Sequence, residues 1–346
     1  MAKQIKQIKQ IKQIKQIKQI RQNINGVFLL NKDSNISSQN AMQQIRRLFN
    51  AKKAGHIGTL DPLATGVLPI CFGDATKFSQ DLNNADKTYI AEIQFGVNTD
   101  TCDADGQILE NFLNDNKIVN AENINAKKIN EILVEKFSGE ILQTPPQFSA
   151  IKINGQKMYQ LAREGVKIDM PPRKIKIYVA NLLSFDAQNF TAKIEISCSK
   201  GTYIRSIARD LGNFLHCGGY LKSLQRTKVG EIDISETLRF ETIKDETTEN
   251  LQKYILPIDF LIQKFVAYDL AEYQESALNI DRFLHGNPII PDGNFDDGDF
   301  KFQQSQIYRI YNQQKFIGTA EYKFFDALQT LCLCPLRLIC SEQRCV

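Results

Sequence analysis

The sequence predicts a mixed α+β protein with a large first domain and a small, separate β-rich domain near the carboxyl end. Three observations point to this class. Stretches with an apolar residue at every second position, typical of strands, alternate with stretches that have the three-to-four spacing of amphipathic helices. Beyond Pro257 the pattern changes to short strands separated by Gly, Pro and Asp turns through Pro335. A length of 346 residues with 42% hydrophobic residues also allows two domains with sizeable cores.

The first predicted elements are a strand, a helix and a long loop. Ordered sequence begins near Asn25, where Gly-Val-Phe-Leu-Leu is typical of a short buried strand. A helix follows, with Ser37 or Ser38 as its N-cap and an apolar stripe that runs to Asn50. Residues 54–78 are dense in Gly, Pro, Thr and Asp, which predicts a long structured loop of the kind that carries function.

The next predicted elements are a strand, a helix and a hairpin. Residues 87–95 alternate between apolar and polar positions and predict a strand, with Tyr89 on its apolar face. Residues 126–137 predict an amphipathic helix. Residues 148–159 contain Asn-Gly, the preferred pair for a two-residue hairpin turn, and the lysines on either side of it predict a basic hairpin.

A second strand and helix predict an unusual position for one arginine. Residues 192–198 alternate as a strand, and a helix follows with Thr202 as its predicted N-cap. Arg205 then lies at the third helical position, where the positive end of the helix dipole disfavours a cation by up to about 1 kcal/mol. We therefore expect Arg205 to have a carboxylate partner.

The formal charge of +4 is concentrated at the amino terminus. Residues 3–20 repeat Lys-Gln-Ile six times, a period that fits neither a helix nor a strand. The first 21 residues hold seven of the 43 Lys and Arg and none of the 39 acids, so the rest carries 36 cations against 39 acids. We expect residues 1–22 to be a low-complexity basic arm that is mostly disordered or transiently helical, and that is either a tolerated repeat expansion or an electrostatic attachment to RNA. Outside the arm the densest basic segment, either a solvated face or a polyanion contact, contains Arg46, Arg47, Lys52 and Lys53.

The cysteines predict reduced thiols rather than a metal centre. The chain has eight cysteines and no Cys-x-x-Cys pair, and four of the eight lie in the last 15 residues without a histidine nearby. A zinc-dependent nucleic-acid module at the carboxyl end is the alternative. No run of about 18 apolar residues and no apolar signal segment occurs, so we expect no membrane span, no export and a cytoplasmic location.

One run in the predicted loop resembles a known active-site motif. Residues 55–70, Gly-His-Ile-Gly-Thr-Leu-Asp-Pro-Leu-Ala-Thr-Gly-Val-Leu-Pro-Ile, closely resemble the active-site motif of the TruB family of tRNA pseudouridine synthases. The likeness continues in the family's order through residues 86–89, 148–152, 198–205 and 224–227. It covers the chain from about residue 25 to about residue 338, which makes it more specific than any single short motif.

The resemblance implies a fold, a reaction and a partner. The fold is a mixed-sheet pseudouridine synthase core at residues 23–255, with an inserted thumb at about 144–172, a PUA-like domain at 256–339 and a tail at 340–346. The reaction is the isomerisation of the uridine at position 55 in the T-loop of tRNA, and it needs no cofactor or metal. The implied partner is the T-arm of tRNA, and the enzyme is expected to be a monomer without an obligate protein partner.

Three residues match the family's catalytic positions. Asp61 matches the nucleophile, and a carboxylate can either bond to one fragment or stabilise a sugar cation. Whether it attacks the uracil ring or the anomeric carbon stays open, and in another context an Asp-Pro pair is a turn former. Arg205 matches the active-site arginine, and we pair it with Asp61. Tyr89 matches the tyrosine that stacks on the flipped base and has been proposed to help remove the ring proton; a strand tyrosine is otherwise a core residue.

Five residues match or suggest substrate contacts. His56 matches the residue that braces the vacancy left by the flipped base, although a histidine in such a loop also serves as a structural hydrogen-bonding group. Tyr203 and Leu224 match residues that pack around the everted nucleotide, and both also fit an ordinary core. Lys77 is assigned a phosphate or structural contact, and Lys152, in the thumb-like segment, a contact to the RNA backbone.

The chain departs from the family pattern at two positions, and one other class of function stays open. Asp33 follows Lys32 where relatives usually carry proline, and Gln225 replaces the common arginine before Arg226. Neither change removes a catalytic group. The alternative function is a tRNA-binding or tRNA-folding chaperone that uses the same surface, and the two roles can coexist because exposing the target uridine is itself a remodelling step.

Overall fold

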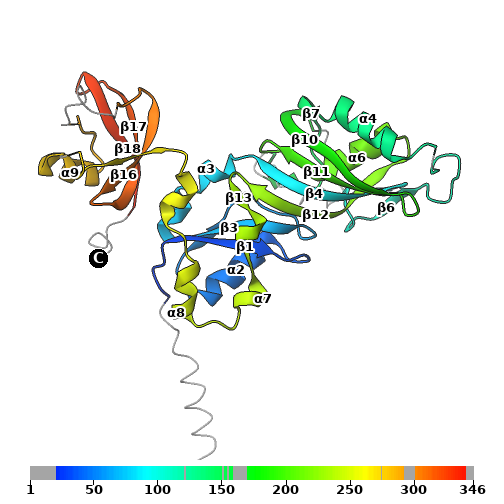
Figure 1. Cartoon of the computed structure of the whole chain (residues 1–346), viewed down its shortest axis with the longest axis horizontal. Helices are drawn as coiled ribbons and strands as arrows, with labels where there is room; N and C mark the ends of the chain where they lie inside the picture. The colour runs from blue at the N-terminus through cyan, green and yellow to red at the C-terminus, as the bar shows by residue number, and fades with distance from the viewer. Residues whose placement is uncertain are drawn as a thin grey trace, which may run out of the picture.

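The computed structural model contains a large mixed sheet with helices and a small β-rich domain beside it (Figure 1). It describes residues 21–120, 122–149, 152–153, 156–158, 170–273, 275–291 and 301–339. The predictions for the Lys-Gln-Ile repeat, for much of the thumb-like segment and for the tail after residue 339 lie outside these residues.

Ten strands form the large sheet. Its path is β14-β1-β3-β12-β4-β11-β10-β7, with β2 added beside β3 and β13 beside β12. The bounds are β1 Gly26–Lys32, β2 Ala54–His56, β3 Thr65–Phe72, β4 Lys87–Phe95, β7 Gly139–Gln143, β10 Arg173–Asp186, β11 Thr191–Cys198, β12 Gly219–Val229, β13 Ile232–Asp233 and β14 Leu238–Arg239. Neighbours are antiparallel except for β1 with β14 and β3 with β12. The β3–β12 contact has only two residue pairs, so it is a narrow junction between the two halves of the sheet.

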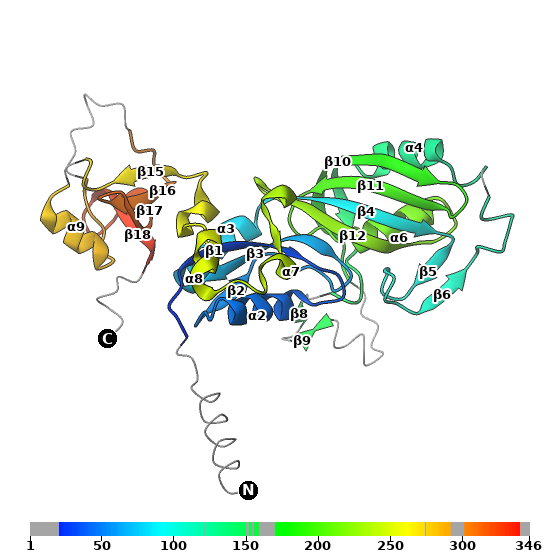
Figure 2. The same ribbon diagram turned by 60° about the horizontal axis from the view of Figure 1, so that its bottom comes forward.

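Three helices cover one face of this sheet. They are α2 (Ser38–Leu48), α4 (Ala126–Lys136) and α6 (Ile204–Phe214), and their apolar stripes share one core with β1, β3, β4, β10 and β11. Ser37 caps α2 by accepting a hydrogen bond from the backbone N–H of Asn40. Figures 1 and 2 place α4 over one end of the sheet and α2 near the other.

A second core lies on the opposite face of β1 and β3. It joins Val27, Leu29 and Val67 of the sheet to Phe78 and to Phe316 of the small domain. Because alternate residues of β1 belong to the two cores, the strand is apolar at nearly every position.

Short elements connect these layers. Their bounds are η1 Gly73–Lys77, α3 Ser79–Asn83, β5 Val97–Thr99, β6 Ile108–Asn111, β8 Lys152–Ile153, β9 Gln156–Lys157, η2 Ile234–Glu236, α7 Phe240–Ile243, α8 Thr248–Leu251, η3 Gln252–Tyr254 and η4 Ile258–Ile262. β5 pairs with β6, and β8 pairs with β9, each as a small separate sheet.

The described residues of the small domain form a four-stranded sheet in the order β15-β16-β17-β18, with helix α9 beside it. The bounds are β15 Val266–Asp269, α9 Ala277–Leu284, β16 Gln306–Asn312, β17 Lys315–Phe325 and β18 Thr330–Leu338. Tyr268, Phe283 and Tyr308 lie in its core. The ring centroids of Phe78 and Phe316 are 5.5 Å apart, and an Arg337–Asp81 ion pair of 3.0 Å adds a second contact to the first domain.

Most predicted elements of the first domain are confirmed. The strands near residues 25, 87–95 and 192–198 appear as β1, β4 and β11, and the helices appear as α2, α4 and α6. Ile153 of β8 pairs with Gln156 of β9, in agreement with the predicted hairpin, while the predicted Asn-Gly turn itself lies outside the described residues. None of the described helices is long and apolar enough to cross a membrane.

Three predictions need correction. The segment 54–78 is not one long loop, because β2, β3 and η1 lie within it. The N-cap of α6 is Tyr203 rather than Thr202, so Arg205 is the second helical residue, and the Thr202 hydroxyl instead donates to the Ser199 carbonyl at 2.9 Å. The small domain contains helix α9 and strands of up to 11 residues, not only short strands and turns.

Candidate active site

Asp61 lies in the loop between β2 and β3, and side-chain hydrogen bonds fix the backbone of the residue before it and of the residue after it. The Ser38 hydroxyl accepts from the backbone N–H of Leu60 and donates to its carbonyl, both at 2.8 Å. On the other side, the Lys32 ammonium donates to the carbonyl of Pro62 at 3.2 Å. The first turn of α2 and the end of β1 therefore fix the backbone at Asp61, while its side chain stays 39% exposed.

Lys32 is a buried cation whose ammonium group donates hydrogen bonds to backbone carbonyls of this loop and of the segment before α2. Its ammonium also donates to the carbonyls of Asp33 and Ile36, at 2.9 and 2.7 Å. Burial lowers its pKa to about 8, and the nearby charges of Asp33 and Asp61 oppose that change. The Asp33 that replaces the family's proline thus accepts one of the three hydrogen bonds through its backbone.

Arg205 lies against Asp61 at the amino end of α6. Its Nε is 2.9 Å from Asp61 Oδ2, and the contact is an ion pair without the alignment of a hydrogen bond. The other guanidinium nitrogens donate to the carbonyls of Thr101, at 3.2 Å, and Phe148, at 2.9 Å. The Arg205 side chain is only 7% exposed, so its orientation is fixed from several sides.

A second carboxylate, Asp103, completes the surroundings of Arg205. Its Oδ2 is 3.4 Å from Arg205 Nη1, and its side chain is 6% exposed. Burial raises the pKa of Asp103, while the Thr101 hydroxyl and then Arg205 oppose the rise. Arg205 therefore lies between an exposed carboxylate that faces the cavity and a buried one that faces the protein.

A cavity of about 670 Å³ opens beside these groups. Five of the eight residues selected from the sequence line it, namely Asp61, Tyr89, Tyr203, Arg205 and Leu224. Its wall also includes the cations Lys87, Arg173, Lys174, Lys200 and Arg226. One exposed carboxylate in a wall rich in cations suits a ligand that carries negative charge close to the reacting group.

Arg226 fixes the floor of the cavity. It is 1% exposed, and its guanidinium donates to the carbonyls of Val67 and Gly58, both at 2.8 Å. Gly66 permits this arrangement, because its φ is +104° and a Cβ there would lie 2.1 Å from the Arg226 carbonyl oxygen. Beside it, burial raises the pKa of Tyr89, and Arg226 partly opposes that rise.

Two predicted residues, His56 and Lys77, are not among the described residues that line this cavity, and the side chain of a third, Lys152, lies outside the described part of the chain. His56 is in β2, and its Nε2 is 3.2 Å from the Thr59 hydroxyl; burial, and then the charge of Arg226, lower its pKa. Lys77 forms an ion pair with Asp74 at 3.0 Å and donates to the Leu338 carbonyl at 3.0 Å, which is the structural alternative for this lysine. Lys152 is in β8, opposite Lys157 of β9.

Asp103 is a residue of this site that the sequence does not single out. The segment Thr99-Asp100-Thr101-Cys102-Asp103 contains two carboxylates and two hydroxyls, which is the available signal. That composition is also typical of ordinary turns. A bridge between Asp103, in the connection from β5 to β6, and Leu221 of β12 holds Asp103 near Arg205, and the Phe148 carbonyl has no side-chain signature at all.

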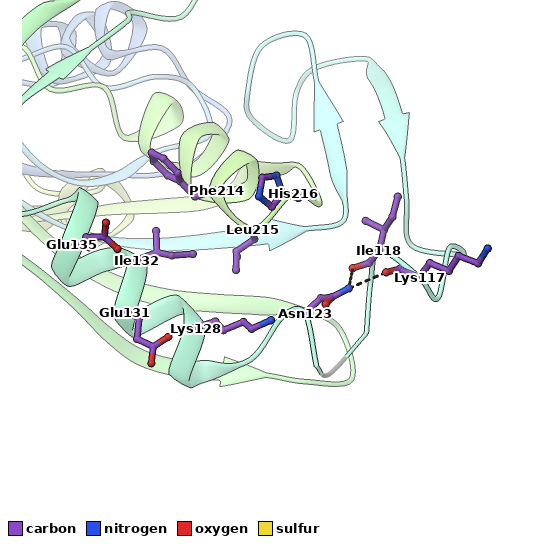
Figure 3. A pocket seen from close by; sticks show the side chains of 10 residues that line it. All are labelled: Lys117, Ile118, Asn123, Lys128, Glu131, Ile132, Glu135, Phe214, Leu215 and His216. Carbon is purple, nitrogen blue, oxygen red and sulfur yellow. Dashed lines mark hydrogen bonds between the residues drawn. The ribbon is translucent and has the colours of Figure 1, made fainter.

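A second cavity lies away from these groups, between α4 and the carboxyl end of α6 (Figure 3). It has about 470 Å³, and its lining includes Ile132, Phe214, His216, Glu131 and Lys128. It contains no close pair of ionised groups that resembles Asp61 and Arg205. The described residues also contain no group of three or more His, Cys, Asp or Glu that could hold a metal ion.

Comparisons with known proteins agree with this geometry. Residues 46–204 match the model of the TruB family pseudouridylate synthase N-terminal domain, and residues 205–263 match the tRNA pseudouridylate synthase B C-terminal domain. The tRNA pseudouridine synthase B of Francisella tularensis subsp. holarctica is 44% identical over 312 residues, which cover 88% of this chain and 96% of that protein. The protein of the same name from Francisella philomiragia is 41% identical over 316 residues, with the same two coverages.

Solved structures share the fold at low sequence identity. An H/ACA ribonucleoprotein bound to a substrate RNA containing 2′-deoxyuridine matches with a TM-score of 0.63 and 19% identity, over 92% of this chain and 86% of that chain. A Cbf5-Nop10-Gar1 complex matches over the same shares with a TM-score of 0.62 and 20% identity.

Proposed function

The chain belongs to the TruB family of pseudouridine synthases and is an isomerase that converts uridine to pseudouridine in tRNA; we propose that its target is uridine 55 of the T-loop and that Asp61 is the nucleophile. The observation that carries the proposal is the 2.9 Å ion pair between the exposed Asp61 and the buried Arg205 at the wall of the large cavity. Because its substrate is tRNA, we place the activity in the cytoplasm.

The proposed reaction balances without a redox step. The bond between uracil N1 and the anomeric carbon breaks, the base turns, and a bond forms between C5 and the same carbon. The proton on C5 leaves and N1 gains one. Asp61 either bonds to one of the two fragments or stabilises the charge on the sugar, and Arg205 keeps the carboxylate correctly oriented during both steps.

We propose that Tyr89 stacks on the flipped uracil. Its raised pKa keeps the phenol neutral near pH 7, which suits a stacking surface. The family's proton-removal role would then need help from the neighbouring Arg226, whose charge opposes the rise in pKa. Tyr203 and Leu224, on the same cavity wall, would pack around the everted nucleotide.

We propose further roles for His56, Lys152 and the small domain. His56 lies in β2, directly before the loop that carries Asp61, where it could brace the stack that the uridine leaves. Its lowered pKa makes a neutral ring the form that would do so. We also propose that Lys152, in the β8–β9 hairpin, binds the RNA backbone, and that the small domain contacts RNA as its resemblance to PUA domains implies.

The test measures release of tritium from carbon-5-labelled uridine in an unmodified tRNA transcript. Wild type should release tritium from the uridine transcript and none from a transcript with cytidine at the target position. Asp61→Asn should lower the rate by about a thousandfold or more, because it removes the nucleophile, while tRNA binding stays within a few fold. Release by Asp61→Asn at the wild-type rate would reject the nucleophile assignment.

The same experiment examines the chaperone alternative. A folded wild-type protein that binds tRNA and releases no tritium would contradict turnover at this uridine. It would move a tRNA-folding role ahead of catalysis. Normal tRNA folding by Asp61→Asn, with turnover lost, would instead mean that the two roles coexist and that tRNA folding does not need the nucleophile.

A further inference from the structure

The start of helix α6 is held from outside by a side chain at the end of β7. Tyr203, the N-cap of α6, makes no capping hydrogen bond with its own side chain. Its backbone N–H donates to Gln143 Oε1 at 2.8 Å, and its carbonyl accepts from Gln143 Nε2 at 3.1 Å. Gln143 is 3% exposed and ends β7, an end strand of the large sheet beside β10 (Figure 1). Its amide therefore makes the two bonds that a neighbouring strand would make.

The two partners of the Gln143 amide fix its orientation. A backbone N–H can only donate and a carbonyl can only accept, so exchanging the nitrogen and the oxygen of the amide would break both bonds. The carbonyl of Tyr203 also accepts the first hydrogen bond of α6, from the N–H of Ile207 at 3.2 Å. A glutamine thus satisfies both backbone groups at once, and an apolar or charged side chain of similar size does not.

The segment that follows Gln143 holds the next residues of α6 through its backbone. The Thr144 carbonyl accepts from the Ser206 hydroxyl at 2.9 Å, and the Phe148 carbonyl accepts from Arg205 at 2.9 Å. Because these acceptors are carbonyls, residues of other types could supply them. Gln143 differs, since its side chain makes the contact and a substitution can therefore remove it.

The turn held by Gln143 carries two groups of the candidate active site. The side chain of Tyr203 lines the large cavity, and Arg205 follows two residues later with its Nε 2.9 Å from Asp61 Oδ2. That ion pair lacks the alignment of a hydrogen bond, so it does not by itself fix the place of the guanidinium. A misplacement of about 1 Å at a reacting group can lower a rate by about a hundredfold. The position of this turn therefore matters for the reaction.

We propose that Gln143 is a positioning residue, which acts through the backbone of Tyr203 to keep the Tyr203 ring and the Arg205 guanidinium in place for the reaction. Gln143 is not among the described residues that line the cavity, and it has no contact with Asp61. The inference deepens the proposed function and rests on it for the identity of the reaction.

The first test is the variant Gln143→Met, which keeps the length of the side chain and removes both hydrogen bonds. Its turnover at saturating tRNA, measured by tritium release, should fall about 10- to 100-fold. Its KM for tRNA should stay within about threefold, because Gln143 is buried and touches no ligand. Turnover at the wild-type rate would overturn the proposal.

The second test is the variant Gln143→Glu, whose effect depends on pH. An ionised carboxylate can accept from the Tyr203 N–H but has no proton for the carbonyl, whereas a neutral carboxyl group can make both bonds. The ratio of variant to wild-type turnover should therefore rise about tenfold or more between about pH 8 and about pH 5. The corresponding ratio for Gln143→Met should not change with pH.

The surroundings of Gln143 set the range over which this recovery is measured. Burial and the facing Tyr203 carbonyl favour the neutral carboxyl group. Arg173, the register partner in β10, and Arg205 and Arg209 of α6 favour the ionised form. Burial raises the pKa of the Tyr203 phenol, so this group stays neutral throughout. A titration from about pH 5 to about pH 8 covers the range between these opposing effects.

Gln188→Glu is the matched control. Gln188 is exposed in the turn between β10 and β11, and the substitution changes the net charge by the same amount. Turnover by this variant should equal that of wild type at each pH. A recovery at low pH as large as that of Gln143→Glu would reject the proposal, because the effect would then come from net charge.

Urea unfolding of each variant separates positioning from a purely structural role. If both Gln143 variants lose the folded state and low pH restores no turnover to Gln143→Glu, the residue only supports folding and the proposal is wrong. If wild type forms no pseudouridine in the tRNA transcript, the proposed function fails. If wild type is active and both variants keep its rate at every pH, the proposed function stands and the inference about Gln143 fails.

Discussion

At the residue scale, the candidate site depends on one arginine between two carboxylates. The Asp61–Arg205 pairing was predictable, because a cation near the start of a helix needs an anion and the motif supplied one. Asp103 was not predictable from its own segment, since a cluster of Asp and Thr is typical of turns. Its contact with Arg205 depends on the bridge that holds the connection between β5 and β6 against Leu221 of β12.

We expect Asp103→Asn to lower turnover by about 10- to 100-fold and to leave the KM for tRNA within about threefold. The substitution keeps the shape of the side chain but removes the charge that holds Arg205 from behind, so Asp61 loses its fixed orientation. Steady-state tritium release gives both constants. Asp105→Asn, an exposed neighbour, is the control. Full turnover by Asp103→Asn would mean that the carbonyls of Thr101 and Phe148 suffice to hold Arg205.

The buried Lys32 predicts a change of stability with pH. Its folded pKa of about 8 is below the usual 10.5, so between these values the unfolded chain binds more protons and rising pH favours the folded state. Relative to Lys32→Met, wild type should therefore gain roughly 1 to 2 kcal/mol of unfolding free energy between pH 7.5 and pH 9.5. Urea unfolding at the two pH values measures this gain. An unchanged difference would mean that Lys32 keeps its proton in the folded protein.

At the scale of elements, periodicity identified the strands and helices that have one polar face. It failed for β3, which lies within the segment interpreted as a loop. β3 is buried at seven of its eight positions, because it has a core on each side, and it contains Pro69. A strand that is buried on both faces shows no alternation of apolar and polar residues, and a proline is unusual within a strand, so its sequence does not show the expected pattern. Strand β10, mostly exposed, was missed as well.

The narrow junction between β3 and β12 predicts a strict need for glycine at position 66. Gly66→Ala should lower the free energy of unfolding by about 3 kcal/mol or more and abolish tritium release, because its Cβ would displace the backbone of Arg226 from the cavity floor. Gly139→Ala is the control, since Gly139 also has a positive φ of +72° but nothing lies within 4 Å of its Cβ position. The control should cost about 1 kcal/mol. Similar losses in the two variants would argue against a steric cause.

At the scale of the whole molecule, the change near Pro257 to a pattern of short strands and turns indicated a second domain. It did not indicate how the two domains contact each other. The contacts come from residues distant in sequence, such as Phe78 with Phe316 and Asp81 with Arg337. Each of these residues alone looks like an ordinary core or surface position. The described residues that line the cavity beside Asp61 all lie between Gly58 and Arg226, so none of them belongs to the described part of the small domain.

This arrangement predicts that stability and catalysis can be separated at the domain interface. Phe316→Ala should remove about 3 kcal/mol or more of packing against Phe78 and the second core, so that the small domain unfolds in a separate, earlier transition. Turnover of an isolated T-arm stem-loop should stay within about twofold of wild type, because the Asp61 cavity is intact. Phe324→Ala, on the same strand but 48% exposed, should change neither property and is the control. Calorimetry measures the unfolding transitions, and tritium release measures the turnover. If Phe316→Ala unfolds in a single transition and loses turnover of the stem-loop, the small domain supports the catalytic sheet directly.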